Sequence, residues 1–289
     1  MIKKGIILAG GMGSRLSPLT KVSNKQLLPL YDKPLIFYPL SVLMLSGIRK
    51  ILIIVNLGQK EIFKKLLGNG SDFGLDITYK EQIKPRGLPD AFILGEKFIK
   101  NDSVALILGD NFFYGQGFTK RLNFITKKNK GSTIFAYNVK NPQDYGIVTL
   151  DKKNKIQKIE EKPKKPKTNF AITGLYFFDK NVVKYAKKLK PSKRGELEII
   201  DVLKSYLKAN KLNLEFIGRG GAWLDAGNVK DLFDASQFVA SIEERQGLKI
   251  ACLEEIAFNN AWIKRKNLME RIKFYGKCSY SEYLKSILK

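Results

Sequence analysis

The sequence contains no histidine among its 289 residues. Histidine is the usual general base near neutral pH and a common metal ligand, so its absence excludes Ser-His-Asp triads and the usual zinc and non-haem iron sites. Two cysteines, Cys252 and Cys278, are too few for a disulfide framework or a thiolate zinc site. Any chemistry must therefore use carboxylates, lysine, arginine or backbone amides, with or without a hard metal ion.

Acidic residues are scarce: 27 Asp and Glu accompany 52 Lys and Arg, giving a formal net charge of +25. This surplus suits a polyanionic partner, such as nucleic acid, an anionic membrane or phosphorylated small molecules. The same surplus also arises when lysines are simply scattered over a solvated surface. We favour this interpretation, because we find no basic face interleaved with aromatic residues. No apolar run approaches the roughly 18 residues of a membrane-spanning helix, and no signal-peptide pattern is found. We expect a cytoplasmic protein without nucleic-acid or membrane partners.

Strand and helix patterns alternate in the first half of the chain. Apolar runs typical of buried strands occupy residues 5–9, 50–55, 77–80 and 104–108. Helical patterns between them occupy residues 34–46, 60–67 and 91–99. This alternation predicts a parallel, doubly wound sheet.

The pattern changes from residue 133 onward, where strands predominate. Strand patterns occupy residues 133–139, 146–150, 156–159, 171–178 and 213–217. Helical patterns occupy residues 193–209 and 229–245, and the last 40 or so residues look mainly helical. We therefore expect a mixed sheet in this part, followed by C-terminal helices.

A glycine-rich loop follows the first strand and reads Leu-Ala-Gly-Gly-Met-Gly-Ser-Arg-Leu. Gly10, Gly11 and Gly13 allow backbone N–H groups to approach an anion closely, and Arg15 adds a fixed positive charge. The loop is not a Walker A motif, since no Gly-Lys-Ser/Thr follows. It is not a dinucleotide motif either, because Leu16 replaces the third glycine. A tight turn without a ligand remains the alternative.

Two aspartates each end an apolar stretch. Asp110 follows the strand pattern at residues 104–108, and Asp225 lies in Trp-Leu-Asp-Ala-Gly. Ligands of doubly wound sheets bind beyond the carboxyl ends of the strands. Each aspartate alone could cap a turn. Together with phosphate oxygens, two carboxylates form the hard oxygen set that Mg²⁺ prefers.

Further polar groups suit a sugar phosphate and a pyrimidine. Glu161 can accept hydrogen bonds from two hydroxyls, and the neighbouring Lys162 can meet a phosphate; a charged loop is the alternative. Gln82 carries both a donor and an acceptor, as the imide edge of thymine or uracil requires.

The glycine loop, continued by Pro18, Thr20 and then Lys-Gln-Leu-Leu-Pro at 25–29, resembles the signature of sugar-phosphate nucleotidylyltransferases. Its form is similar to the bacterial glucose-1-phosphate thymidylyltransferase branch. The resemblance extends from Lys4 to about Ile263. It implies an Mg²⁺-dependent enzyme that joins dTTP to glucose-1-phosphate, and a homotetramer. It also implies a Rossmann-like, doubly wound mixed α/β sheet with an inserted sugar-binding sheet region and C-terminal helices.

The resemblance also implies roles for individual residues. Arg15 and Lys25 would contact the triphosphate, Asp110 and Asp225 would hold Mg²⁺, and Lys162 would steer the attacking phosphate. With Asp110, the three basic residues form the expected catalytic set. The expected substrate-binding residues are Gly10, Gly11, Gly13, Ser14, Gln26, Gln82, Gly87, Asn111, Tyr145, Gly146, Glu161, Ile172 and Trp223. The nucleophile is already an anion, so the absence of histidine agrees with this chemistry.

The expected domains are a nucleotidyltransferase core at 1–227 and a helical extension at 228–289. Within the core, about 1–132 would bind the nucleotide and about 133–227 the sugar phosphate. Gly-Leu-Pro-Asp-Ala at 87–91 differs from the branch's usual Gly-Leu-Ala-Gln-Ala beside the base. A transferase using UTP, CTP or another hexose phosphate is therefore an alternative. A basic nucleic-acid-binding protein and an inactive nucleotide sensor are the remaining ones.

Overall fold

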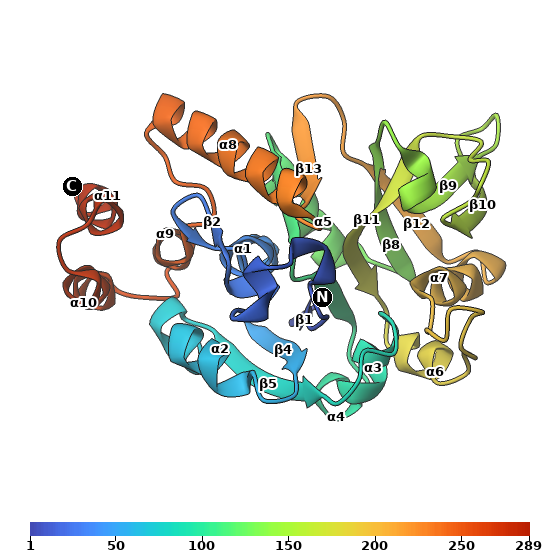
Figure 1. Cartoon of the computed structure of the whole chain (residues 1–289), viewed down its shortest axis with the longest axis horizontal. Helices are drawn as coiled ribbons and strands as arrows, with labels where there is room; N and C mark the ends of the chain where they lie inside the picture. The colour runs from blue at the N-terminus through green and yellow to red at the C-terminus, as the bar shows by residue number, and fades with distance from the viewer.

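The computed structural model describes all 289 residues, and its centre is a nine-stranded sheet (Figure 1). The strands are ordered β10–β9–β11–β6–β1–β4–β5; in addition, β8 pairs with β11, and β12 pairs with β8. Their bounds are Lys4–Ala9 (β1), Lys50–Asn56 (β4), Asp76–Gln82 (β5), Val104–Leu108 (β6), Ser132–Asn138 (β8), Gly146–Leu150 (β9), Ile156–Glu161 (β10), Phe170–Phe178 (β11) and Leu212–Phe216 (β12).

The sheet has a parallel half and a mixed half. Strand β1 is parallel to both β4 and β6, and β4 is parallel to β5. Strand β11 runs antiparallel to β6, β8 and β9. The predicted doubly wound mixed sheet is therefore confirmed.

Helices cover both faces of the sheet. One face packs against α1 (Phe37–Leu45), α2 (Lys60–Leu67), α5 (Phe118–Lys128) and α9 (Leu253–Asn259). The other packs against α3 (Asp90–Leu94), α4 (Glu96–Ile99), α6 (Val182–Ala186) and α7 (Ile199–Lys208). Successive strand residues serve opposite cores: Ile6 joins the second cluster and Ile7 the first. Burial on both faces explains the continuous apolar runs of the parallel strands.

Three details differ from the sequence expectations. The helical pattern at 91–99 is interrupted at Gly95, which separates α3 from α4. The helix expected from residue 193 begins at Ile199, since the preceding loop contains Gly195 with φ 78°. Helices α5 and α6 were not expected, nor was the paired β7 (Asn111–Gly115) and β13 (Gly221–Asp225).

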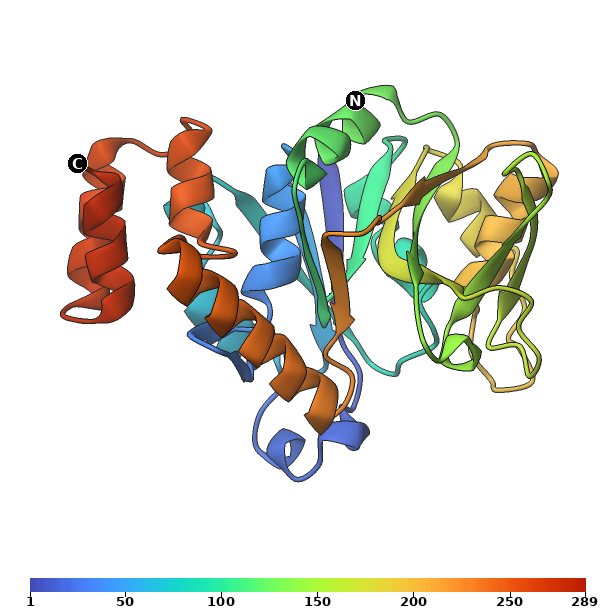
Figure 2. The same ribbon diagram turned by 90° about the horizontal axis from the view of Figure 1, so that it is seen from above.

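The C-terminal part is helical. Helix α8 spans Val229–Gln246. Asn228 caps its N-terminus by accepting from the Asp231 N–H, and Gly247 caps its C-terminus in a left-handed conformation. Helices α10 (Arg265–Tyr275) and α11 (Ser279–Ile287) form a hairpin at one end of the molecule (Figure 2). No helix has a stretch long and apolar enough to cross a membrane.

A buried ion-pair cluster attaches the end of α8 to the short β2–β3 pair (Pro29–Leu30 with Lys33–Pro34). Glu243 accepts from the Nζ atoms of Lys33 at 2.9 Å and Lys249 at 3.2 Å, and from the Ile250 N–H at 2.8 Å. Asp32 bonds the same two lysines. The Lys33 and Glu243 side chains are only 2% and 5% exposed, so their charges depend on each other.

Replacing Glu243 with Gln should destabilise the protein by about 3 kcal/mol, because it leaves Lys33 buried with one carboxylate fewer. Urea unfolding followed by circular dichroism measures this change. The exposed neighbour Glu244 provides the matched control, Glu244→Gln, for which we expect a change within about 0.5 kcal/mol. Equal stabilities of the two variants would contradict the interpretation.

Candidate active site

The pairing of β7 with β13 brings the two predicted metal ligands together. Strand β7 begins one residue after Asp110, and β13 ends at Asp225. The strands are antiparallel, with Asn111 opposite Asp225. The Ala226 N–H donates to the Asp110 carbonyl oxygen at 3.1 Å. Two carboxylates far apart in the sequence thus become neighbours beyond the carboxyl end of β6.

The two aspartates and two basic residues form one charged group. Burial raises the pKa of Asp225 to about 7, and the charge of Asp110 adds to this effect, while Lys25 and Arg15 oppose it. Lys25 Nζ lies 2.5 Å from Asp110 Oδ2. A Cβ atom on Gly227 would lie 3.1 Å from Arg15 Nη2, so Arg15 packs beside the residues that follow β13. Such mutual repulsion between partly buried carboxylates is relieved by a cation.

The glycine loop packs directly against Gln82. A Cβ on Gly10 would lie 1.7 Å from Gln82 Nε2, so any larger residue there would displace the Gln82 amide. Asn56, at the end of β4, exchanges two hydrogen bonds with Gly11, at 3.0 and 2.9 Å, and accepts from Gln82 Nε2 at 3.1 Å. Our sequence analysis missed Asn56. Its place at a strand's carboxyl end, as with Asp110, was the available signal.

The remaining loop residues lie around this centre. Gly13 adopts a left-handed conformation with φ 60°, and its carbonyl accepts from Thr20 at 2.9 Å. Ser14 is exposed in the same loop. Gln26 is buried beneath Gly109, and its Oε1 has no hydrogen-bond partner in the protein.

Gly87 lies where the loop before α3 meets the backbone before α7. Its φ is 101°, and a Cβ there would lie 2.1 Å from the Leu197 carbonyl oxygen. The next residue, Leu88, lines the cleft described below. The buried Asp90 accepts from Arg86 at 2.6 Å, so Pro-Asp at 89–90 forms a regular helix start.

A cleft of about 640 Å³ joins the charged group to the second half of the sheet. Arg15 and Asp225 line it together with five residues expected to bind the sugar phosphate, namely Tyr145, Gly146, Glu161, Lys162 and Ile172. The cleft is therefore the space in which a nucleotide phosphate and a sugar phosphate could meet.

An arginine that our sequence analysis missed contacts Glu161, one of the residues that line this cleft. Arg194 Nη2 lies 3.6 Å from Glu161 Oε1 and 2.9 Å from Glu198 Oε1. Burial and the charge of Glu198 raise the pKa of Glu161, and Arg194 and Lys162 oppose them. In the sequence, Arg194 belongs to an unremarkable charged loop, so only the tertiary contact reveals it.

The buried side chain of Asn111 forms hydrogen bonds to Asp110, Trp223 and Gly174. Its Oδ1 accepts from Trp223 Nε1 at 2.6 Å and from the Gly174 N–H at 3.0 Å. Its Nδ2 donates to Asp110 Oδ1 at 3.0 Å, and the residue is 1% exposed. Trp223 in turn packs edge-on against Tyr145, with ring centroids 5.3 Å apart. The structure thus places Asn111 and Trp223 as supports of Asp110 and of the cleft wall.

The donor set fits a magnesium ion held jointly with substrate. No group of three or more Asp, Glu, His or Cys side chains forms a closed metal cage. Mg²⁺ characteristically binds through one or two carboxylates, water and substrate phosphates. Asp110 and Asp225 supply this minimal set.

Comparison with known proteins decides the family. The sequence signature described as nucleotidyl transferase matches residues 4–242. The chain belongs to the nucleotidyl transferase family. The expected family and enzyme class are therefore confirmed.

The relatives of this nucleotidyl transferase extend over its whole length. Glucose-1-phosphate thymidylyltransferases from Neisseria meningitidis and Mycobacterium tuberculosis are 52% and 46% identical to it, each covering 99% of both chains. A solved UDP-glucose pyrophosphorylase complexed with UDP-glucose is 25% identical, with a TM-score of 0.73, covering 85% of this chain and 100% of that one. A Bacillus anthracis structure, provisionally assigned as a glucose-1-phosphate thymidylyltransferase and containing sucrose, is 40% identical. Its TM-score is 0.75, covering 81% of this chain and 94% of that one.

Replacing Asn111 with Asp should lower kcat by about 10- to 100-fold, because it removes a donor to Asp110 and adds a competing carboxylate. Steady-state pyrophosphate release measures kcat and KM separately, and we expect the triphosphate KM to change less than kcat. The exposed Asn101, changed to Asp, is the control. Unchanged turnover in Asn111→Asp would contradict the supporting role.

Proposed function

We propose that this nucleotidyl transferase transfers the thymidylyl group of dTTP to glucose-1-phosphate, giving dTDP-glucose and pyrophosphate. The observation that carries the proposal is the single cleft lined by Arg15 and Asp225 at one end and by Glu161 and Lys162 at the other. The relatives at 46–52% identity, which carry this activity in their names, support the substrates.

The chemistry needs positioning and charge neutralisation rather than proton transfer. The sugar phosphate is an anion near neutral pH and attacks the α-phosphorus in line while pyrophosphate leaves. Lys162 orients the attacking phosphate, and Arg15 and Lys25 balance the charge of the triphosphate. Asp110 and Asp225 would hold Mg²⁺, which when bound neutralises phosphate oxygens. The histidine-free sequence agrees with this division of labour.

The base is selected beside the glycine loop. Asn56 already accepts from the Gln82 amide nitrogen, so Gln82 Oε1 is left to accept from the imide N–H that thymine and uracil share. Neutral cytosine has no such donor, which argues against CTP. UTP remains the second candidate, and the likeness to a UDP-glucose pyrophosphorylase structure favours keeping it.

The homotetramer expected from the resemblance and the cytoplasmic location expected from the sequence patterns belong to the same proposal. So do the division into a 1–227 core and a 228–289 helical extension. Sedimentation of the purified protein tests the oligomeric state directly.

Among dTTP, UTP, CTP, ATP and GTP, dTTP should release pyrophosphate fastest when glucose-1-phosphate and Mg²⁺ are present, with UTP second. Inorganic pyrophosphatase with colorimetric detection of the phosphate formed measures the rate for all five triphosphates. EDTA should reduce every rate to background. A higher kcat/KM for UTP would replace the first candidate with the second. No turnover with any triphosphate would refute both.

Replacing Asp110 with Asn should lower kcat by at least about 100-fold while the fold is retained, because it removes one of the two carboxylates expected to hold Mg²⁺. The same assay across a Mg²⁺ titration measures the effect. Asp76→Asn, at an exposed aspartate of β5, is the matched control and should keep normal turnover. Near-normal rates for Asp110→Asn would overturn the metal assignment.

A further inference from the structure

Strand β12 leaves one hydrogen-bonding edge of the sheet open. It pairs only with β8, in parallel. The Lys211 carbonyl accepts from the Ser132 N–H at 2.8 Å, and the Ile217 N–H donates to Ala136 at 2.9 Å. Backbone groups alternate in direction along a strand, so odd-numbered residues of β12 point toward β8. The N–H groups of Leu212, Leu214 and Phe216 therefore point away from the sheet.

The same edge also presents acceptors. The carbonyl groups of Leu212 and Leu214 point outward with their N–H groups, by the same alternation. Only the Phe216 carbonyl is bonded from the protein, by the Arg121 guanidinium. An open edge of this kind is a template for another extended chain.

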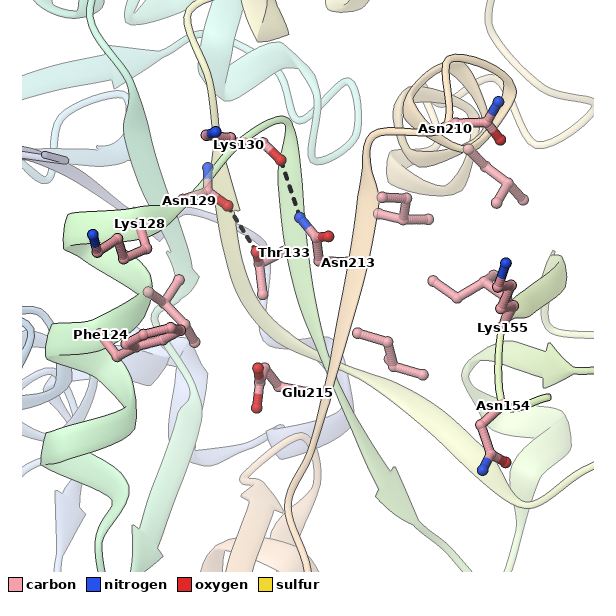
Figure 3. Close-up of a pocket in the computed structure, with 15 residues that line it drawn as sticks. Phe124, Lys128, Asn129, Lys130, Thr133, Asn154, Lys155, Asn210, Asn213 and Glu215 are labelled. Atoms are coloured by element: carbon pink, nitrogen blue, oxygen red, sulfur yellow. Dashed lines mark hydrogen bonds between the residues drawn. The ribbon is translucent and has the colours of Figure 1, made fainter.

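A cavity of about 830 Å³ surrounds this open edge. Figure 3 shows β12 running between two walls, with Phe124 and Lys128 of α5 on one side and Asn154 and Lys155 of the β9–β10 turn on the other. The edge is thus recessed in a groove. None of the residues lining the groove lines the catalytic cleft.

The two walls differ in chemistry. The side chains of Asn213 and Glu215 share a face with Thr133, toward α5, where Lys128 and Lys130 lie. Leu212 and Leu214 lie on the opposite face, within the second hydrophobic cluster. That face of the groove also includes Leu207 and Ile156. An extended chain on β12 would place alternate side chains against a basic wall and an apolar wall.

We propose that this groove binds an extended segment of another protein in which acidic and apolar residues alternate, adding a strand to the sheet at β12. Main-chain hydrogen bonds to Leu212 and Leu214 would provide affinity, and the two walls would select the side chains. The interaction goes beyond the proposed catalytic function and uses none of its residues.

Charge favours this occupant over a second copy of the chain. The groove is lined by three lysines, Lys128, Lys130 and Lys155, and by one carboxylate, Glu215, which lies 3.8 Å from the guanidinium of Arg121. Symmetric pairing of two β12 edges would bring Lys128, Lys130 and Lys155 toward their own counterparts. Like charges brought together in this way oppose association, whereas an acidic segment is attracted.

The probe is a fluorescein-labelled peptide, Glu-Val-Glu-Val-Glu-Val-Glu, titrated with the full-length protein and followed by fluorescence anisotropy. We expect saturable one-to-one binding that weakens as salt increases. The same peptide with an N-methyl group on every residue can donate no strand hydrogen bond from either edge and should not bind. Absence of saturable binding of the unmodified peptide, or equal binding of the N-methylated one, overturns the proposal.

Two variants locate the interaction. Leu214→Pro removes an outward N–H that makes no bond to β8, and should weaken binding about tenfold. A Lys128→Glu, Lys130→Glu double variant should lose the acidic peptide and instead bind Lys-Val-Lys-Val-Lys-Val-Lys. Both variants should keep pyrophosphate release, which shows that they are folded. If both bind the acidic peptide as the unmodified protein does, the site is wrong.

Sedimentation of the unmodified protein and of the Leu214→Pro variant tests whether the groove instead binds a second copy of the chain. The proposal expects the same oligomeric state for both. The proposal fails if the unmodified protein binds no peptide and the Leu214→Pro variant dissociates into smaller oligomers. In that case the β12 edge contacts a second copy of the chain. Neither result depends on the identity of the sugar or the nucleotide, so failure here leaves the proposed function untouched.

Discussion

The site depends on the repulsion between two carboxylates that the fold holds together. Five residue pairs of the β7–β13 ladder, with Asn111 opposite Asp225, fix the two aspartates side by side. Burial and this proximity make the second negative charge costly, as the raised pKa of Asp225 records. Lys25 and Arg15 offset part of that cost from the loop side. In the proposed mechanism a bound cation would offset the rest, and an enzyme without histidine could then act on phosphates.

Strongly periodic elements could be predicted from sequence, but the pairing that makes the site could not. Strand β6 and helix α2 follow the expected bounds because each is one uninterrupted apolar or amphipathic pattern. Strands β7 and β13 are five residues each, and their pairing joins segments far apart in the chain. Their register is set by tertiary contact. The start of α7 was misplaced because the charged residues before Ile199 suit a helix equally well in isolation.

Motif reasoning identified the residues expected to act on phosphate, but it missed two residues that contact other members of the expected site. Arg15, Lys25, Asp110 and Asp225 gather as expected, while their roles remain predictions. Asn56 and Arg194 were missed because their meaning lies in contacts with Gly11 and Glu161, which no local pattern encodes. Asn111 was expected to touch substrate, and its polar atoms are instead bonded to Asp110, Trp223 and Gly174.

The amide of Asn56 ties the glycine loop and Gln82 into one rigid unit. In the proposed function, these hydrogen bonds couple the residue that would recognise the nucleobase to the loop that would receive the phosphates. A nucleobase bound slightly out of place would therefore shift the α-phosphorus away from the in-line geometry that the attacking phosphate needs. Discrimination between nucleotides should then appear in the rate of the chemical step as well as in the strength of binding.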